Sequence, residues 1–159
     1  MIRLMSLCDS LAENALTALR IKDPIRVSPN QTVREVIGAM QRAERGCAVV
    51  TEHDKPIGVF TERDIVTKVL GNNTAFDTKM ADVMTPRPTV IRDGCTLAEV
   101  IHVMHDGGFR HIPVVDAAGL LTGVVSVRGI VEYMVEHFPA AVFNLPPDPN
   151  QKQVSREGA

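Results

Sequence analysis

Thr61 and Asp64 are polar residues that lie where a strand pattern changes to a helix pattern. The Asp64 carboxylate can accept hydrogen bonds, and the Thr61 hydroxyl can both donate and accept them, so either side chain could contact a ligand. Backbone amides at such a junction favour a nearby anion. The structural alternative is that Thr61 or Glu62 caps the helix and Asp64 stabilises its first turn.

Other reactive side chains form weaker patterns. His102 and His105 are an i, i+3 pair beside Asp106, which could bind a metal, but no further ligand has an evident place and a polar helix end explains them equally. Cys47 begins an apolar strand and is interpreted as a core thiol. No Ser-His-Asp order or HExxH string stands out, and nothing supplies a nucleophile, a base and an electrophile together. We therefore expect no catalysis.

Composition limits the classes of partner. The chain has 159 residues, of which 45% are hydrophobic and 23% charged, with a net charge of −2. This balance argues against broad nucleic-acid binding, which needs clustered positive charge. Its three cysteines indicate neither a disulfide framework nor a CxxC metal site, so a reducing cytoplasm is the expected location. Asp9 and Glu13 interrupt any signal-peptide core, and no apolar run reaches the ~20 residues that span a bilayer.

An internal repeat organises the chain. Residues 24–40 match residues 88–104 at a shift of 64, and residues 45–66 match residues 110–131 at a shift of 65. The first match contains six identities and the second contains eight, among them Gly58 with Gly123. One residue inserted in the loop after the helix explains the change of shift.

Each repeat predicts the order strand–helix–strand–strand–helix. Thr32 with Glu35, and Thr96 with Glu99, form capping boxes ahead of apolar residues at helical spacing. Runs of residues that favour strands predict strands at 47–51, 57–61, 111–115 and 121–125. The second helix of each repeat is expected to start near 62 and near 127. A unit of about 50 residues buries too little surface to be stable alone, so two copies are expected to share a core.

The predicted boundaries are an N-terminal helix at 1–22, repeats at 23–71 and 88–138, a linker at 72–87 and a tail at 139–159. The N-terminal segment carries Leu4, Leu7, Leu11, Ala15 and Leu19 at roughly helical spacing and is expected to pack on the repeats or on a partner. The linker predicts a short helix at 79–84. The tail is rich in proline, and its polar end is expected to be disordered.

The second repeat, ADVMTPRPTVIRDGCTLAEVIHVMHDGGFRHIPVVDAAGLLTGVVSVRGIV, resembles a CBS motif (named after cystathionine β-synthase) along its whole length, and the first repeat matches through GVFTERDIV. The chain thus resembles a tandem CBS protein of the bacterial stand-alone type. The resemblance implies an α+β (α/β) fold, the Bateman module, in which two β-α-β-β-α repeats pack through their sheets with pseudo-twofold symmetry. It also implies homodimers, regulation of another protein, and adenosine compounds bound in clefts between the repeats.

The family marks a nucleotide site by the string G-h-x-[ST]-x-x-D, where h is apolar. Residues 58–64 match it in full, which gives the Asp64 carboxylate the role of holding the ribose diol. The second repeat has Gly129 in place of this aspartate. We therefore expect one good adenosine site in each chain, with the second cleft either empty or bound differently.

The resemblance also implies the rest of the site. Phosphate contacts fall on Arg45, Arg110, His111 and Arg128, with Arg63 inside the matched string, although solvated surface positions are the alternative for each. Because Arg128 precedes Gly129, its repeat can serve the other repeat's ligand. An apolar adenine slot would be lined by residues that can equally be ordinary core, namely Ile25, Val27, Cys47, Ala48, Val59 and Pro113.

The leading hypothesis is a sensor module that binds AMP, ADP or ATP and relays ligand state to an unidentified partner protein, with no cofactor required. S-adenosylmethionine ranks behind these nucleotides because the phosphate positions are rich in arginine, and NAD is also ranked behind them. The alternative is a dimeric interaction scaffold that binds no ligand. Neither nucleic acid nor membrane is an expected partner.

Overall fold

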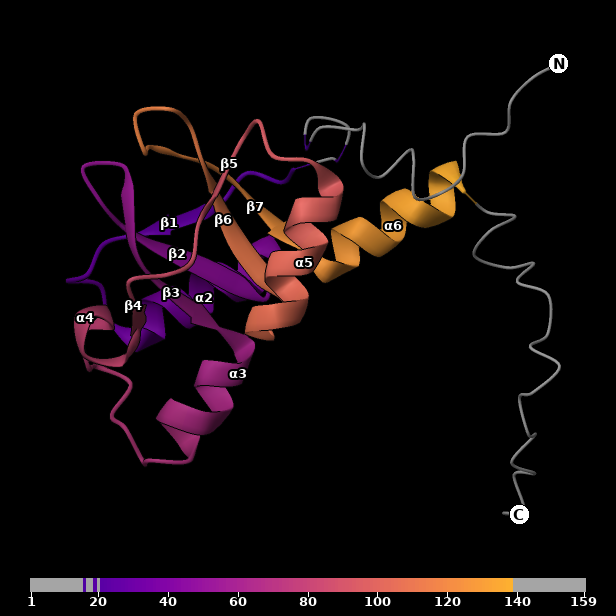
Figure 1. Cartoon of the computed structure of the whole chain (residues 1–159). Coiled ribbons are helices and arrows are strands. Elements are labelled where there is room, and N and C mark those ends of the chain that lie inside the picture. The colour runs from indigo at the N-terminus through magenta and orange to yellow at the C-terminus, as the bar shows by residue number, and fades with distance from the viewer. Residues whose placement is uncertain (1–15, 17–18, 20, 139–159) are drawn as a thin grey trace, which may run out of the picture.

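The computed structural model describes residues 16, 19 and 21–138 (Figure 1). Most of the predicted N-terminal helix and the whole proline-rich tail therefore lie outside the described residues. The first half of the chain contains β1 (Ile25–Val27), α2 (Val33–Ala43), β2 (Cys47–Glu52), β3 (Lys55–Thr61), α3 (Glu62–Asp64) and η2 (Ile65–Leu70). The linker and second half contain α4 (Met80–Val83), β4 (Thr85–Pro86), β5 (Ile91–Arg92), α5 (Leu97–Gly107), β6 (His111–Val115), β7 (Leu121–Ser126) and α6 (Val127–His137).

The strands form two sheets with the same internal order. In the first, β1 runs parallel to β2, while β3 is antiparallel to both β2 and β4, which gives the order β1-β2-β3-β4. In the second, β5 runs parallel to β6 and β7 is antiparallel to it, in the order β5-β6-β7. The predicted strand–helix–strand–strand–helix order is confirmed for both repeats, and with it the α+β fold class.

Both first helices begin where the capping boxes predict. The Thr32 and Thr96 hydroxyls each accept a hydrogen bond from the backbone amide three residues later, at 3.3 Å in both repeats. In return the Glu35 and Glu99 carboxylates accept from the threonine amides at 2.7 Å. These reciprocal bonds satisfy amides that the helix leaves without an internal partner, so the helix start is determined locally.

The prediction that the two repeats share one core is wrong: each repeat has its own apolar core, and each core is completed by chain that precedes the other repeat. The first core includes Val33, Val36 and Phe60 together with Met80 and Val83 of the linker helix α4. The second core, around Leu97, Val100, Ile112 and Val114, takes in Leu16 and Leu19 from ahead of the first repeat. The predicted helix at 79–84 is confirmed as α4, and Leu19 packs on the second repeat.

The central strands are covered on both faces. Ala48 and Val50 of β2 face the helices of the first core, while Val49 between them points to the opposite face and is also fully buried. The repeats are joined directly as well, because the Arg26 guanidinium donates to the Leu121 carbonyl at 2.8 Å and the Leu121 amide donates to the Asp54 carbonyl at 2.8 Å.

The second helix of the first repeat differs from the prediction of a regular helix starting near Glu62. Only α3 is α-helical, and the chain continues as the π-helix η2, in which the Gly71 amide bonds to the Val66 carbonyl five residues earlier. Its counterpart α6 is a regular α-helix of 11 residues. The Thr67 hydroxyl donates to the Arg63 carbonyl at 2.9 Å, an interaction that often accompanies bent helices.

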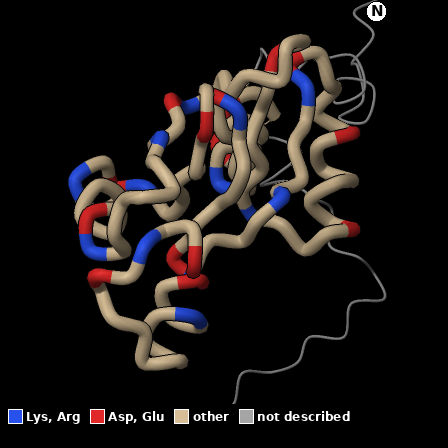
Figure 2. The backbone as a smooth tube through the Cα atoms, turned by 90° about the vertical axis from the view of Figure 1, so that its left-hand side faces the viewer, with Lys and Arg blue, Asp and Glu red and all other residues tan. Residues whose placement is uncertain are grey.

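Charges of both signs are mixed along the described backbone, as Figure 2 shows for the face turned by 90° from Figure 1. Such mixing agrees with the low net charge of the sequence. Among the described residues, no helix combines the length and the apolar character needed to cross a membrane.

Candidate functional site

Two short segments, which we call the crossing segments, each lead into one repeat but lie on the sheet of the other. They are residues 21–22 and 85–86. Lys22, ahead of the first repeat, forms an antiparallel bridge with Val124 of β7. Residues 85–86, ahead of the second repeat, form β4 and pair with Val59 and Gly58 of β3. Each crossing segment therefore borders the strand-to-helix junction of the repeat it lies on.

The glycine of each G-h-x-[ST] string has no side chain, so a residue in or next to the crossing segment can lie directly against it. A Cβ atom on Gly58 would collide with the Met84 side chain, and one on Gly123 would collide with Ile21. Both glycines have ordinary negative φ angles, so the requirement is close approach rather than backbone conformation. The repeated glycine thus has a structural reason that the sequence did not predict.

At the first junction, residues 61–64, the capping alternative holds. Thr61 is the N-cap of α3, and its amide and hydroxyl donate to Asp64 Oδ2 at 2.9 and 2.7 Å. The Asp64 amide lies 3.4 Å from the Thr61 hydroxyl oxygen, which completes a capping box. One carboxylate oxygen of the predicted diol acceptor is therefore engaged within its own helix turn.

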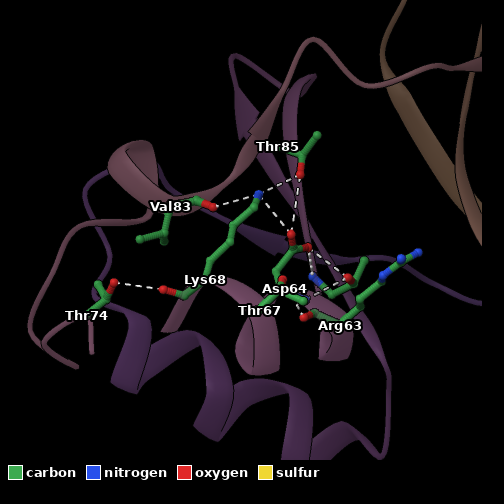
Figure 3. Close-up of polar contacts among 8 residues, drawn as sticks. Arg63, Asp64, Thr67, Lys68, Thr74, Val83 and Thr85 are labelled. Carbon is green, nitrogen blue, oxygen red and sulfur yellow. Dashed lines mark hydrogen bonds and ion pairs between the residues drawn. The ribbon is translucent and has the colours of Figure 1, made fainter. Parts of the chain in front are cut away.

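The other oxygen of Asp64 belongs to a polar cluster that Figure 3 shows. Lys68 Nζ lies 2.8 Å from Asp64 Oδ1 and also donates to the Val83 carbonyl at 3.1 Å and the Thr85 hydroxyl at 2.7 Å. Burial acts to raise the pKa of Asp64, but hydrogen bonds from Lys68 and Thr61 outweigh it and leave the pKa below its usual value. The carboxylate is thus held charged, with a side chain only 12% exposed.

The second junction, residues 126–129, lacks this carboxylate. Ser126 caps α6 by accepting a hydrogen bond from the Gly129 amide at 3.1 Å. The Arg128 side chain is exposed and pairs with Glu132 on the next turn at 2.9 Å. The capping geometry is therefore kept in both repeats, whereas the acidic acceptor is present in the first alone.

A cavity of about 300 Å³ lies beside the second junction and is lined by both repeats. Predicted phosphate contacts Arg45, His111 and Arg128 all border it, as do Ile25 and Cys47 from the predicted adenine slot. Its remaining described lining is Leu19, Ile21, Lys22, Asp23, Pro24, Glu44, Gly46, Glu62, Val124, Val125, Ser126 and Gly129. The structure thus brings together basic groups from two repeats, but beside Gly129 rather than Asp64.

The other predicted site residues do not border this cavity among the described residues. Thr61 and Asp64 lie at the first junction, and Arg63 and Arg110 are exposed. The remaining four are placed as follows: Val27 and Ala48 in the first core, Pro113 buried in β6, and Val59 half-buried opposite Thr85. Nothing tests their roles in binding, which stay predictions.

Sequence reasoning missed three acidic groups on the cavity wall, Asp23, Glu44 and Glu62. The Glu62 carboxylate lies against Gly46, where a Cβ atom would be 3.0 Å from its Oε2. A signal for Glu62 was available, because it directly follows the threonine at the first junction. Asp23 and Glu44 approach the cavity only through the fold.

Burial shifts the pKa values of two side chains that line the cavity, Cys47 and His111. It raises the pKa of the Cys47 thiol to about 12, and the negative charge of Asp64 adds to this shift. It lowers the pKa of His111, with a further lowering by Arg110 and an opposing effect of Glu62. At neutral pH, Cys47 is therefore a protonated core thiol, as its position in the sequence indicates, and an uncharged His111 is favoured.

The histidine pair of the sequence is found on α5. His102, His105 and Asp106 are all exposed. Within the part of the chain that the structure describes, no group of three or more His, Cys, Asp or Glu side chains is placed to hold a metal ion. The fold therefore adds no ligand to this pair.

Comparison with known families finds the CBS domain twice, at residues 17–71 and 80–136. Among curated proteins, a CBS domain-containing protein of Arabidopsis thaliana is 38% identical over 104 residues, which is 65% of this chain and 19% of that protein. An uncharacterized protein of Methanopyrus kandleri is 34% identical over 113 residues, covering 70% of this chain and 58% of that protein. The chain thus spans less than two thirds of the length of either relative.

Solved structures share the fold. A CBS-domain containing protein from Agrobacterium tumefaciens is 30% identical with a TM-score of 0.64, covering 70% of this chain and 84% of that one. The cytosolic domain of the Mg²⁺ channel MgtE, solved in complex with ATP, is 25% identical with a TM-score of 0.64, covering 78% and 50%. A CBS domain protein from Pyrobaculum aerophilum complexed with AMP has a TM-score of 0.70 at 24% identity, covering 77% and 97%.

Proposed function

The chain belongs to the CBS-domain family, and we propose that it is a non-catalytic regulatory module that binds an adenosine nucleotide between its two repeats. The observation that carries this proposal is the cavity of about 300 Å³, to which the first repeat contributes Arg45 and the second contributes His111 and Arg128. Its volume lies near the lower end of the ~300–1,000 Å³ range of small-molecule sites. A mononucleotide suits this size better than a dinucleotide.

The lining matches the parts of a nucleotide. The guanidinium groups of Arg45 and Arg128 suit phosphate oxygens, because charged, bidentate donors bind them strongly. Ile25, Cys47 and Val125 offer apolar surface for a base. AMP, ADP and ATP are therefore the first ligands to test, ahead of NAD and S-adenosylmethionine. The ATP complex of the MgtE domain supports this choice.

Ligand binding would regulate the chain by changing how the repeats sit relative to each other. A ligand that touches both repeats shifts their arrangement if it binds one arrangement more tightly than another. The helical faces would then present the change to a partner protein. This mechanism needs no chemical step.

Isothermal titration calorimetry with AMP, ADP, ATP, NAD and S-adenosylmethionine tests the proposal. We expect one of the three nucleotides to bind, and Arg128→Ala to weaken it about tenfold or more through loss of a charge-assisted hydrogen bond. Arg34→Ala is the matched control, since it also removes an arginine from an exposed ion pair, with Asp77, away from the cavity. Binding that is unchanged in Arg128→Ala would place the ligand elsewhere.

Asp64→Ala, tested in the same titration, distinguishes a ribose held at the first junction from one held in the cavity beside the second junction. If the ribose is held at the first junction, this variant weakens binding while Arg128→Ala changes it less. If binding survives Asp64→Ala unchanged, the predicted role of Asp64 is wrong.

A second candidate function is a dimeric scaffold, which exposed apolar side chains favour. Val66 and Leu70 on η2 are each 61% exposed, and Val131 on α6, the counterpart of Val66, is 51% exposed. Because Val66 and Val131 occupy equivalent positions of the two repeats, two copies could pair through a symmetric apolar surface. Homodimerisation is compatible with either function.

Sedimentation velocity tests this surface. The double variant Val66→Glu/Val131→Glu should sediment as a monomer where the wild type sediments as a dimer, because burying two unpaired carboxylates opposes association. A monomeric wild type would contradict the dimer. Absence of thermal stabilisation by any of the five ligands would favour the scaffold over the sensor.

A further inference from the structure

Lys68 connects the predicted sugar-binding carboxylate to the linker between the repeats. Its ammonium group has three hydrogens, and three acceptors surround it: Asp64 Oδ1 at 2.8 Å, the Thr85 hydroxyl at 2.7 Å and the Val83 carbonyl at 3.1 Å (Figure 3). Val83 ends α4, and Thr85 lies in β4. One side chain therefore links the first junction to both regular elements of the linker, the helix α4 and the strand β4.

The second repeat lacks both members of this ion pair. The counterpart of Asp64 is Gly129, and the counterpart of Lys68, at the same shift of 65, is Tyr133. Tyr133 is 7% exposed and packs in the second core, where its ring stacks on His137. The lysine thus accompanies the carboxylate and is absent where the carboxylate is absent.

Acceptor capacity at Asp64 decides whether a sugar can bind beside Lys68. A carboxylate has about four lone-pair sites. Both sites of Oδ2 are used by the amide and hydroxyl of Thr61, and Oδ1 has Lys68 at 2.8 Å with the Thr85 hydroxyl at 3.5 Å. A vicinal diol needs two acceptor sites, so its binding has to displace Lys68 from Oδ1.

We propose that Lys68 is an internal gate at the first junction: it occupies Asp64 in the ligand-free chain and is released when a ribose diol takes its place. This inference rests on the proposed function, and it adds that the ribose of the adenosine compound is held by Asp64, which lies outside the cavity beside the second junction. Release of Lys68 removes its bonds to Val83 and Thr85 as well. Occupancy of Asp64 is thereby converted into a loosened linker, which is where a change between the repeats can begin.

Titration of wild type and Lys68→Met with adenosine tests the gate. Adenosine carries the diol but no phosphate, so losing the positive charge of Lys68 does not obscure the result. Methionine keeps the apolar stem and removes the ammonium group. We expect binding about fivefold tighter in Lys68→Met, which corresponds to about 1 kcal/mol at 25 °C. The gain should disappear in Lys68→Met/Asp64→Asn, since the gate acts through this carboxylate.

Lys55→Met is the matched control, because Lys55 is an exposed lysine at the far end of β3 from the first junction. Adenosine that binds wild type and Lys68→Met equally, or binds the variant more weakly, overturns the gate and leaves the proposed function intact. If no adenosine compound binds either protein, the proposed function fails and the gate fails with it.

Hydrogen exchange provides a readout at the linker. Adenosine should speed exchange of the amides between Val83 and Arg87 in wild type, while ligand-free Lys68→Met should already exchange rapidly there. The Arg87 amide is a suitable reporter because it donates a hydrogen bond to the Ile57 carbonyl at 3.0 Å. If β4 detaches from β3, this bond breaks and the amide hydrogen exchanges with solvent. Unchanged exchange at these amides in both cases would contradict the gate.

Discussion

At the scale of single residues, Cys47 illustrates how burial suppresses the reactivity of a thiol. Its pKa of about 12 means that almost no thiolate forms at pH 8, and the thiolate is the nucleophilic form. We expect Cys47 to react with iodoacetamide far more slowly than Cys95, which is half-buried. Peptide mass spectrometry measures both rates in one sample. Equal rates in the folded protein would contradict the prediction, whereas equal rates in denaturant are expected.

Asp64 contributes to stability in a pH-dependent way. Its folded pKa lies below the value of ~3.9 expected in the unfolded chain, so its contribution is present above that value. The contribution is lost as the pH falls through the lower, folded pKa. Asp64→Asn should therefore destabilise the chain by about 1–3 kcal/mol at pH 7, with a smaller difference from wild type in strong acid. Urea unfolding at several pH values from neutral into strong acid measures this difference. A difference independent of pH would contradict the assignment.

At the scale of elements, the crossing segments make specific demands on two glycines. Gly123→Ala should cost about 1–3 kcal/mol of unfolding free energy, because the new methyl group meets the β-branched Ile21. Gly58→Ala should cost less, since the obstructing Met84 side chain is flexible. Thermal unfolding ranks the two variants.

Gly94→Ala is the control for both substitutions. A Cβ atom there meets no atom within 4 Å, and Gly94 does not have a positive φ angle. The midpoint of its unfolding should be unchanged or slightly raised, because alanine restricts the unfolded chain. Equal losses at all three glycines would show that the crossing contacts are not the cause.

At the scale of the whole molecule, the two repeats should unfold together. Each core includes side chains from the segment that precedes the other repeat. Tyr133 is the chain's single tyrosine and there is no tryptophan, so its fluorescence reports on the second core alone. Val36→Ala in the first core should lower stability by about 2 kcal/mol, and the same shift should appear in Tyr133 fluorescence.

Far-UV circular dichroism on the same samples reports on both repeats. Coincident transitions by the two probes are expected for wild type and Val36→Ala. A fluorescence midpoint that stays at its wild-type value while the dichroism midpoint falls would show that the repeats unfold independently.

Much of this architecture was predictable because its causes are local. The capping boxes at Thr32 and Thr96 involve residues three positions apart, and the strand at 111–115 has a continuous apolar pattern. Internal repetition then predicted that both halves have the same order of strands and helices. These features need no knowledge of distant contacts, and the structure confirms them.

The features that escaped prediction depend on contacts between distant parts of the chain. In the sequence, Lys68 has the pattern of an ordinary exposed helix residue. Its hydrogen bond to Thr85, which lies 17 positions further along the chain, is seen only in the folded structure. The cavity is lined by the crossing segment at residues 21–22 together with Gly129, the position where the string lacks its aspartate.

The exchange of crossing segments gives this single chain the connectivity of a domain-swapped dimer whose two halves share one polypeptide. A chain with a single repeat would leave the edge of its sheet at Gly58 and Val59 without β4, and a second copy would have to supply the missing segment. Tandem duplication replaces that bimolecular association with an intramolecular one at high effective concentration. It also allows the two halves to differ in sequence, as they do at the two junctions, where Asp64 in one repeat corresponds to Gly129 in the other.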